Sequence, residues 1–193
     1  MSRASIPGLS ASRTLFRRAL GILLACFGVG AAAAAPHDES VTVVVRSEVI
    51  VERPASLIWP ALLDLKSWKE GIGKIERLSG EAGAQDELRF LTPPDGNAAN
   101  GYFLQTVRVV PGRRLVLKLF PKDRSAFFGF ADFNLREADG RTTVSYDVYL
   151  DFAASSLSET QHRAWRKQQH DAMKSKFDAE HRKLKALVEN ARR

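Results

Sequence analysis

The segment VIVERPASLIWPALLDLKSW, residues 49–68, carries the strongest structural signal in the chain. Its first residues end a β-branched run that alternates polar and apolar side chains, which predicts a strand over 41–52. Pro54 ends this strand and suits the first turn of a helix. Apolar residues then recur at spacings of three and four, so we expect an amphipathic helix over 55–67, in which Pro60 either kinks the helix or confines its start.

Downstream of this segment, strands alternate with turn signals rich in Gly, Pro, Asn and Asp. Residues 75–78 form either a connector or a short strand. The pair Asp139-Gly140 is a strong signal for a tight hairpin between the last two strands. The strands expected in this region are 88–92, 102–110, 115–120, 127–136 and 142–152.

The end of the chain has a different pattern, because residues 155–193 contain no Gly or Pro. Ser156 and Glu159 have the spacing of a capping box, so we expect one long helix from about residue 156. Its apolar stripe is Met173, Phe177, Leu184, Leu187, Val188 and Ala191.

A run of strands followed by a helix predicts an α+β fold. We expect a curved antiparallel sheet of about six to seven strands, wrapped on the long C-terminal helix. One helix does not fill the concave side of so wide a sheet, so we expect a cavity between them.

The chain resembles the START-like helix-grip superfamily (SRPBCC), which includes polyketide cyclase/dehydrase and lipid-transport domains. The resemblance rests on the opening 49–68, on the order and lengths of the strands, and on the closing helix that ends in LKALVE, 184–189. It covers about residues 41–191. It implies a cavity for an apolar or amphipathic small molecule, but it does not select between binding and catalysis.

The first 35 residues read as an export signal. Four arginines and no acid precede an apolar run, and the run ends in five alanines, Ala31–Ala35. We expect a signal peptide over 1–35 with cleavage after Ala34 or Ala35, then a polar leader over 36–40 and a single helix-grip domain over 41–193. The expected location is therefore the periplasm.

Two alternatives for the N-terminus remain open. In the first, the segment is not cleaved and acts as a membrane anchor. Alternatively, Leu23-Leu24-Ala25-Cys26 has the outline of a lipoprotein box. The second is disfavoured because the chain stays apolar after Cys26. Cleavage near Ala35 would leave a mature chain without cysteine.

The formal net charge of +7 is unevenly distributed. Residues 1–35 carry four of the positive charges, so the mature chain has a net charge of +3. Residues 155–193 hold ten Lys+Arg against five Asp+Glu, and the middle of the chain is slightly acidic. This removes most of the case for nucleic acid and leaves peripheral membrane contact through the basic C-terminal helix as a possible interaction.

The candidates for proton transfer are Tyr146, Tyr102 and Asp132. Asp132 lies among phenylalanines, which would raise a carboxyl pKa, but strand alternation also allows a surface position for it. The four histidines have no metal-ligand spacing, so we expect solvated histidines and no metal. No nucleotide-binding loop is present, and no cofactor is expected.

Strand and helix alternation also predicts which side chains line the cavity. Arg89 has the opposite parity to its apolar neighbours and is expected at the surface. The candidate ligand-contacting residues are Leu88, Phe90, Tyr102, Leu104, Leu117, Phe133, Val144, Tyr146, Val148, Met173 and Phe177.

Three functions are compatible with this sequence. The first is an exported, non-catalytic protein that binds a hydrophobic or lipid-like molecule. The second is a cyclase/dehydrase-type enzyme that uses cavity Tyr or Asp side chains. The third is an interaction module that docks its basic helix on a membrane or a partner.

Overall fold

The computed structural model describes residues 40–121, 129–153 and 158–191. The predicted signal peptide and nearly all of the leader lie outside these residues. The strands are β1 (Ser40–Val51), β2 (Lys74–Ser79), β3 (Leu88–Thr92), β4 (Tyr102–Val110), β5 (Arg114–Pro121), β6 (Gly129–Ala138) and β7 (Arg141–Ala153). The helices are α2 (Ala55–Leu63), α3 (Leu65–Trp68), the short 3₁₀ helix η1 (Ala98–Asn100) and α4 (Glu159–Asn190).

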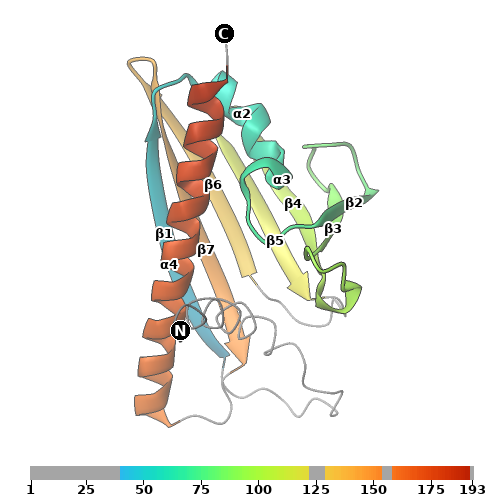
Figure 1. Ribbon diagram of the computed structural model, residues 1–193, viewed down its shortest axis with the longest axis vertical. Helices are drawn as coiled ribbons and strands as arrows, with labels where there is room; N and C mark the ends of the chain where they lie inside the picture. The colour runs from blue at the N-terminus through green and yellow to red at the C-terminus, as the bar shows by residue number, and fades with distance from the viewer. Residues whose placement is uncertain (1–39, 122–128, 154–157, 192–193) are drawn as a thin grey trace, which may run out of the picture. The chain divides into compact units, whose positions relative to one another are not determined.

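All seven strands form one antiparallel sheet in the order β1-β7-β6-β5-β4-β3-β2 (Figure 1). Strands β2 to β7 are successive hairpin neighbours, whereas β1 pairs with the last strand, β7, along its whole length. The α+β helix-grip architecture predicted from the sequence is therefore confirmed. The Asp139-Gly140 hairpin is confirmed as well, since both residues have positive φ, of 51° and 73°, as a two-residue turn of this kind requires.

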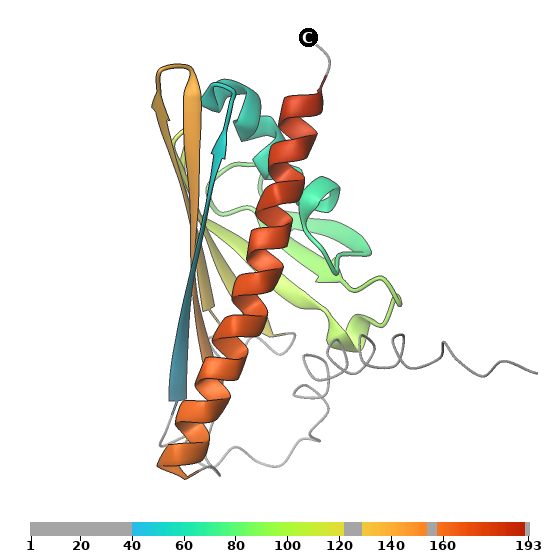
Figure 2. The ribbon, with the colours of Figure 1, turned by 60° about the vertical axis from the view of Figure 1, so that its left-hand side comes forward.

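Helix α4 lies along β1 and also contacts α2 and α3 (Figure 2). With 32 residues it is about 48 Å long. A capping box stabilises its N-terminus, as predicted, but the residues that form it are Ser158 and Gln161 in place of Ser156 and Glu159. The predicted partner Ser156 lies outside the described residues, so the box and the start of the helix come two to three residues later than expected.

The other end of α4 closes over the edge of β1. The Lys185 ammonium donates to the carbonyl of Ile50, and the Glu189 carboxylate accepts from the backbone N–H of Glu52. These contacts satisfy backbone groups that an edge strand would otherwise expose.

Pro60 does not break the first helical segment where the sequence suggested. It lies within α2 at an exposed position, and the interruption comes at Asp64, which separates α2 from α3. The two short helices bury Ile58, Leu62, Leu65 and Trp68 in the core.

The sheet has two chemically distinct faces. The inner face packs against α4 and the short helices, and its core residues include Val45, Leu104, Leu117, Phe133 and Val148. The outer face carries alternating charged and aromatic side chains, among them Arg46, Asp132 and Asp147.

Candidate functional site

Tyr146 occupies the middle of the inner face, on β7. Its ring stacks on Phe133 with a centroid distance of 4.1 Å and meets the edge of Phe177 at 4.9 Å. Only 3% of the residue is exposed. Its hydroxyl therefore lies in an aromatic environment between the sheet and α4.

Lys69, directly after α3, reaches the same place. Its ammonium donates to the Tyr146 hydroxyl at 3.4 Å and to a Glu180 carboxylate oxygen at 3.0 Å. It also lies 5.3–5.6 Å from the ring centroids of Trp68, Tyr146 and Phe177, within the range of cation–π attraction. A buried cation is tolerated here because a carboxylate, a hydroxyl and three rings surround it.

Glu180 is the fully buried partner of Lys69 on α4. Its second carboxylate oxygen accepts the backbone N–H of Glu70 at 3.1 Å. One carboxylate therefore ties α4 both to the ammonium and to the backbone of the segment after α3.

The protonation states follow from this environment. Burial opposes the charge on Lys69, but Tyr146 and Glu180 outweigh that effect and hold its pKa well above the ordinary lysine value. Burial also raises the pKa of Tyr146 to about 12, although Lys69 opposes this shift. Burial likewise raises the pKa of Tyr102, which lies nearby on β4. Lys69 is thus a cation at neutral pH, and both tyrosines are neutral.

Arg89 corrects one prediction from the sequence. It was expected at the surface, but only 7% of it is exposed, and it lies on the inner face opposite Leu104. Its neighbours Leu88 and Phe90, predicted to line the cavity, point to the outer face, where Phe90 packs on Phe103 with a centroid distance of 5.0 Å. That prediction was wrong because the aromatic pair between β3 and β4 forms outside the sheet.

The surroundings of Arg89 leave polar atoms unpaired. Its Nε lies 3.7 Å from the buried Glu87 carboxylate and has no hydrogen-bond partner in the described part of the chain. Thr106 on β4 lies directly across from Glu87, is fully buried, and has an Oγ1 that is also without a partner there. Burial lowers the pKa of Arg89, although the charge of Glu87 opposes this shift.

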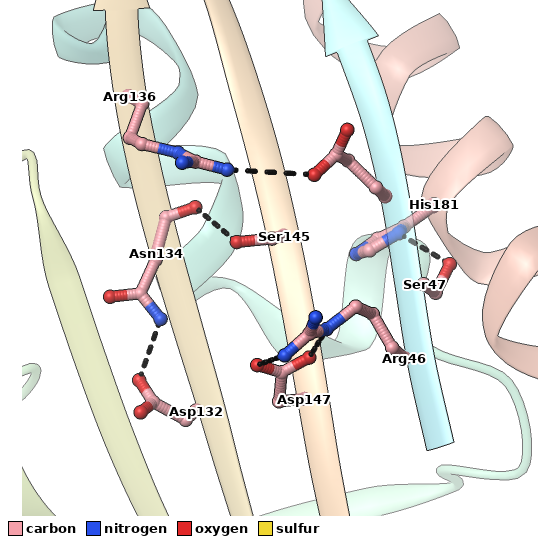
Figure 3. Close-up of polar contacts among 9 residues, drawn as sticks. Arg46, Ser47, Asp132, Asn134, Arg136, Ser145, Asp147 and His181 are labelled. Carbon is pink, nitrogen blue, oxygen red and sulfur yellow. Dashed lines mark hydrogen bonds and ion pairs between the residues drawn. The ribbon is translucent and has the colours of Figure 1, made fainter.

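His181 forms a second buried polar group on α4. Its Nδ1 lies 2.8 Å from the Ser47 hydroxyl (Figure 3). The same hydroxyl donates to the Asp178 carboxylate at 2.7 Å. Because the serine proton goes to Asp178, His181 carries its own proton on Nδ1, and its buried Nε2 is an acceptor without a partner among the described residues. Only 1% of His181 is exposed, so the sequence-based prediction of solvated histidines is wrong at this position.

A pH dependence of stability follows from His181. Burial lowers its pKa to about 4 from the ordinary 6.5, so the unfolded chain binds this proton more readily. The stability that neutral His181 contributes is complete above pH 6.5 and is lost as the pH falls toward 4. We expect the free energy of unfolding to drop by about 2 kcal/mol between pH 7 and pH 5, measured by urea denaturation.

The control for this experiment is a pair of variants. His181→Gln is expected to flatten the pH dependence, and His170→Gln, at a more exposed position on the same helix, is expected to leave it unchanged. The same slope in His181→Gln and the unsubstituted protein would contradict the assignment.

Two surface pockets of the described part of the chain lie away from the space between the sheet and α4. The first, of about 580 Å³, lies on the outer face across β1, β7, β6 and the β4–β5 turn. The second, of about 350 Å³, lies beside β2 and β3.

Comparison with known proteins identifies the architecture. No family model and no curated protein matches the sequence. Among solved structures, the chain resembles protein SA2116 of unknown function from Staphylococcus aureus, with a TM-score of 0.63, 15% identity, and coverage of 79% of this chain and 97% of that one. It also resembles the Zhui aromatase/cyclase from Streptomyces sp. R1128, with a TM-score of 0.59, 16% identity, and coverage of 77% and 94%. A third is protein MLL2253 from Mesorhizobium loti, with a TM-score of 0.55, 17% identity, and coverage of 78% and 99%.

The chain shares the helix-grip fold of these structures. At identities of 15–17% the likeness establishes the fold alone. A shared fold does not determine what this chain binds or catalyses.

The helix-grip fold brings together most of the residues predicted from the sequence. Asp132 is an exception, because it lies on the outer face, where it forms a two-point ion pair with Arg114. Nine predicted residues lie on the inner side of the sheet or on the face of α4 that covers it: Tyr102, Leu104, Leu117, Phe133, Val144, Tyr146, Val148, Met173 and Phe177.

The sequence patterns did not single out Lys69, Glu180 or Thr106 as site residues, and they placed Arg89 at the surface. For Glu180 a signal was present, since its spacing from Phe177 and Leu184 places it on the apolar stripe of the helix-grip fold's closing helix. For Lys69 the sequence holds no such signal. In the described residues, no group of three or more His, Cys, Asp or Glu side chains could hold a metal ion.

Proposed function

We propose that this protein binds a hydrophobic or lipid-like small molecule between the inner face of the sheet and α4. The observation that carries this proposal is the set of buried polar atoms that have no hydrogen-bond partner among the described residues. Arg89 Nε, Thr106 Oγ1 and His181 Nε2 belong to this set. Buried groups of this kind are uncommon in folded proteins, and a ligand that satisfies them would explain their presence.

The polar atoms favour an amphipathic ligand. Leu104 and Leu117 offer apolar contact in the middle of the sheet, whereas Arg89 offers a positive charge at the β3–β4 side. A molecule with an apolar body and an acceptor group, such as a carboxylate or a carbonyl, matches both. That a solved structure of this fold is named an aromatase/cyclase supports an organic small molecule as the occupant.

Binding is favoured over proton-transfer catalysis. A general base has to be unprotonated near the working pH, but Lys69 stays protonated and the pKa of Tyr146 is raised to about 12 by burial. Burial raises the pKa of Tyr102 as well, and Asp132 lies on the outer face. The cluster of Lys69, Glu180 and Tyr146 therefore suits anchoring and hydrogen bonding.

Export is part of the proposal. The basic and apolar pattern of residues 1–35 supports secretion to the periplasm with cleavage near Ala34 or Ala35. In the described part of the chain, no helix combines the length and apolar character needed to cross a membrane. The exposed cations Arg163, Arg166 and Lys167 at the start of α4 would allow transient contact with an anionic membrane during ligand exchange.

Thr106→Val tests the proposal. Valine keeps the shape of threonine and removes the unpaired hydroxyl, so the ligand-free protein is expected to become more stable by about 1 kcal/mol. Ligand occupancy is expected to fall, because the proposal makes this hydroxyl a ligand contact. Native mass spectrometry of the protein purified from a bacterial periplasm measures occupancy, and urea denaturation measures stability.

Thr143→Val, on the outer face of β7, is the matched control and is expected to leave occupancy unchanged. Recovery of ligand-free protein alone, under conditions that keep a lipid on a known lipid-binding protein, would count against the proposal. Equal occupancy in Thr106→Val and the unsubstituted chain would remove Thr106 from the site.

A further inference from the structure

The groove of about 580 Å³ on the outer face is lined by four arginines. Arg46 comes from β1, Arg136 from β6, and Arg113 and Arg114 from the turn between β4 and β5 and the start of β5. Figure 3 shows Arg46 and Arg136 on the same side of the sheet as Asp132 and Asp147. This groove is on the opposite face from the proposed ligand site, so it is a separate feature.

Two of the arginines form the rigid part of the groove. Arg46 donates to both carboxylate oxygens of Asp147, at 2.6 and 3.0 Å, and Arg114 does the same to Asp132, at 3.0 and 2.6 Å. Asp132 also accepts from the Asn134 amide at 3.1 Å. Each guanidinium keeps N–H groups that its aspartate does not use, and these groups are held in place by the two-point pairs.

The other two arginines are not neutralised to the same degree. Arg136 lies 3.7 Å from Glu48, which is longer than a hydrogen bond. Arg113 has no ion-pair partner among the described residues, yet its backbone is fixed, since its N–H donates to Val110 and its carbonyl accepts from Leu135. The groove therefore presents two incompletely paired cations beside two oriented ones.

We propose that this groove binds a soluble ligand that carries a phosphate- or sulfate-type oxyanion. Such a group has several acceptor oxygens for the planar forks of arginine, and its double negative charge matches Arg113 and Arg136. A free anion fits better than a lipid headgroup, because Glu48 and Asp147 in the groove lining would face an anionic membrane surface.

Calorimetric titration of the full chain with inorganic pyrophosphate tests this proposal. The double variant Arg113→Gln with Arg136→Gln is expected to bind about tenfold more weakly, since it loses two charge-assisted contacts at a partly solvated site. Neither residue belongs to the two-point pairs, so the melting temperature is expected to stay unchanged.

The matched control is Arg77→Gln with Lys183→Gln, which removes the same charge at exposed positions outside the groove. It is expected to keep the affinity of the unsubstituted chain. The proposal is overturned if pyrophosphate does not bind at millimolar concentration, if both double variants weaken binding equally, or if the chain binds phosphatidic acid vesicles but not pyrophosphate.

Discussion

Replacement of Lys69 by methionine is expected to lower the free energy of unfolding by about 3–5 kcal/mol. The substitution keeps most of the apolar stem but removes the hydrogen-bonded counter-ion of the Glu180 carboxylate, which is 1% exposed, and leaves it only the more distant ammonium of Lys176 at 3.9 Å among the described residues. Removing one partner of a buried ion pair costs more stability than forming the pair gains, because the remaining charge stays buried with weaker compensation. Urea denaturation at pH 7 measures the effect.

The double variant Lys69→Met with Glu180→Gln separates charge from packing. Glutamine keeps an acceptor for the Glu70 backbone N–H and removes the charge, so we expect it to restore at least half of the lost stability. Lys167→Met, at the exposed pair with Asp171, is the matched control and is expected to change stability by less than about 0.5 kcal/mol. A cost below about 1 kcal/mol for Lys69→Met would mean that the pair is not buried in solution.

Replacement of Phe133 by alanine is expected to cost about 3–5 kcal/mol. Phe133 is 1% exposed, stacks on Tyr146, and meets the edge of the Trp68 ring at 5.9 Å. Its removal would open a cavity at the centre of the inner face and release the two rings beside it. Urea denaturation measures the loss, and near-ultraviolet circular dichroism reports the release of the rings.

Phe133→Leu keeps much of the buried volume and is expected to cost clearly less than the alanine variant. Phe130→Ala lies three residues away on the outer face of the same strand, where the side chain is only partly buried, and is expected to cost about 1 kcal/mol. Similar losses from Phe130→Ala and Phe133→Ala would show that the inner face is not the dominant core.

Most of the fold follows from local patterns. The alternation along 142–152, the Asp139-Gly140 turn and the apolar stripe of the last helix each correspond to an element of the structure. These features depend on residues near each other in the chain, so their spacing is informative. The same patterns predicted part of the site. Strand alternation placed Tyr146 on the inner face, and the apolar stripe of the last helix placed Phe177 opposite it.

The failures have a physical cause in β3. Alternation correctly separates Leu88 and Phe90 from Arg89, but it does not say which set faces the helix. Because Leu88 and Phe90 are hydrophobic, the sequence favoured the inner face of the sheet for them. In the structure, Phe90 instead packs on Phe103 on the outer face, and Arg89 turns inward beside Glu87.

The amino-acid sequence by itself determined the secondary structure, the order of the hairpins and the amphipathic closing helix, because periodicity and turn chemistry act over a few residues. Only the tertiary structure decided which charges are buried. Lys69 and Glu180 are 111 positions apart, and Ser47 and His181 are 134 apart. Their pairing arises when α4 closes over β1 and removes these groups from water, and desolvation of that kind depends on the packed surroundings of a side chain, which local sequence patterns do not encode.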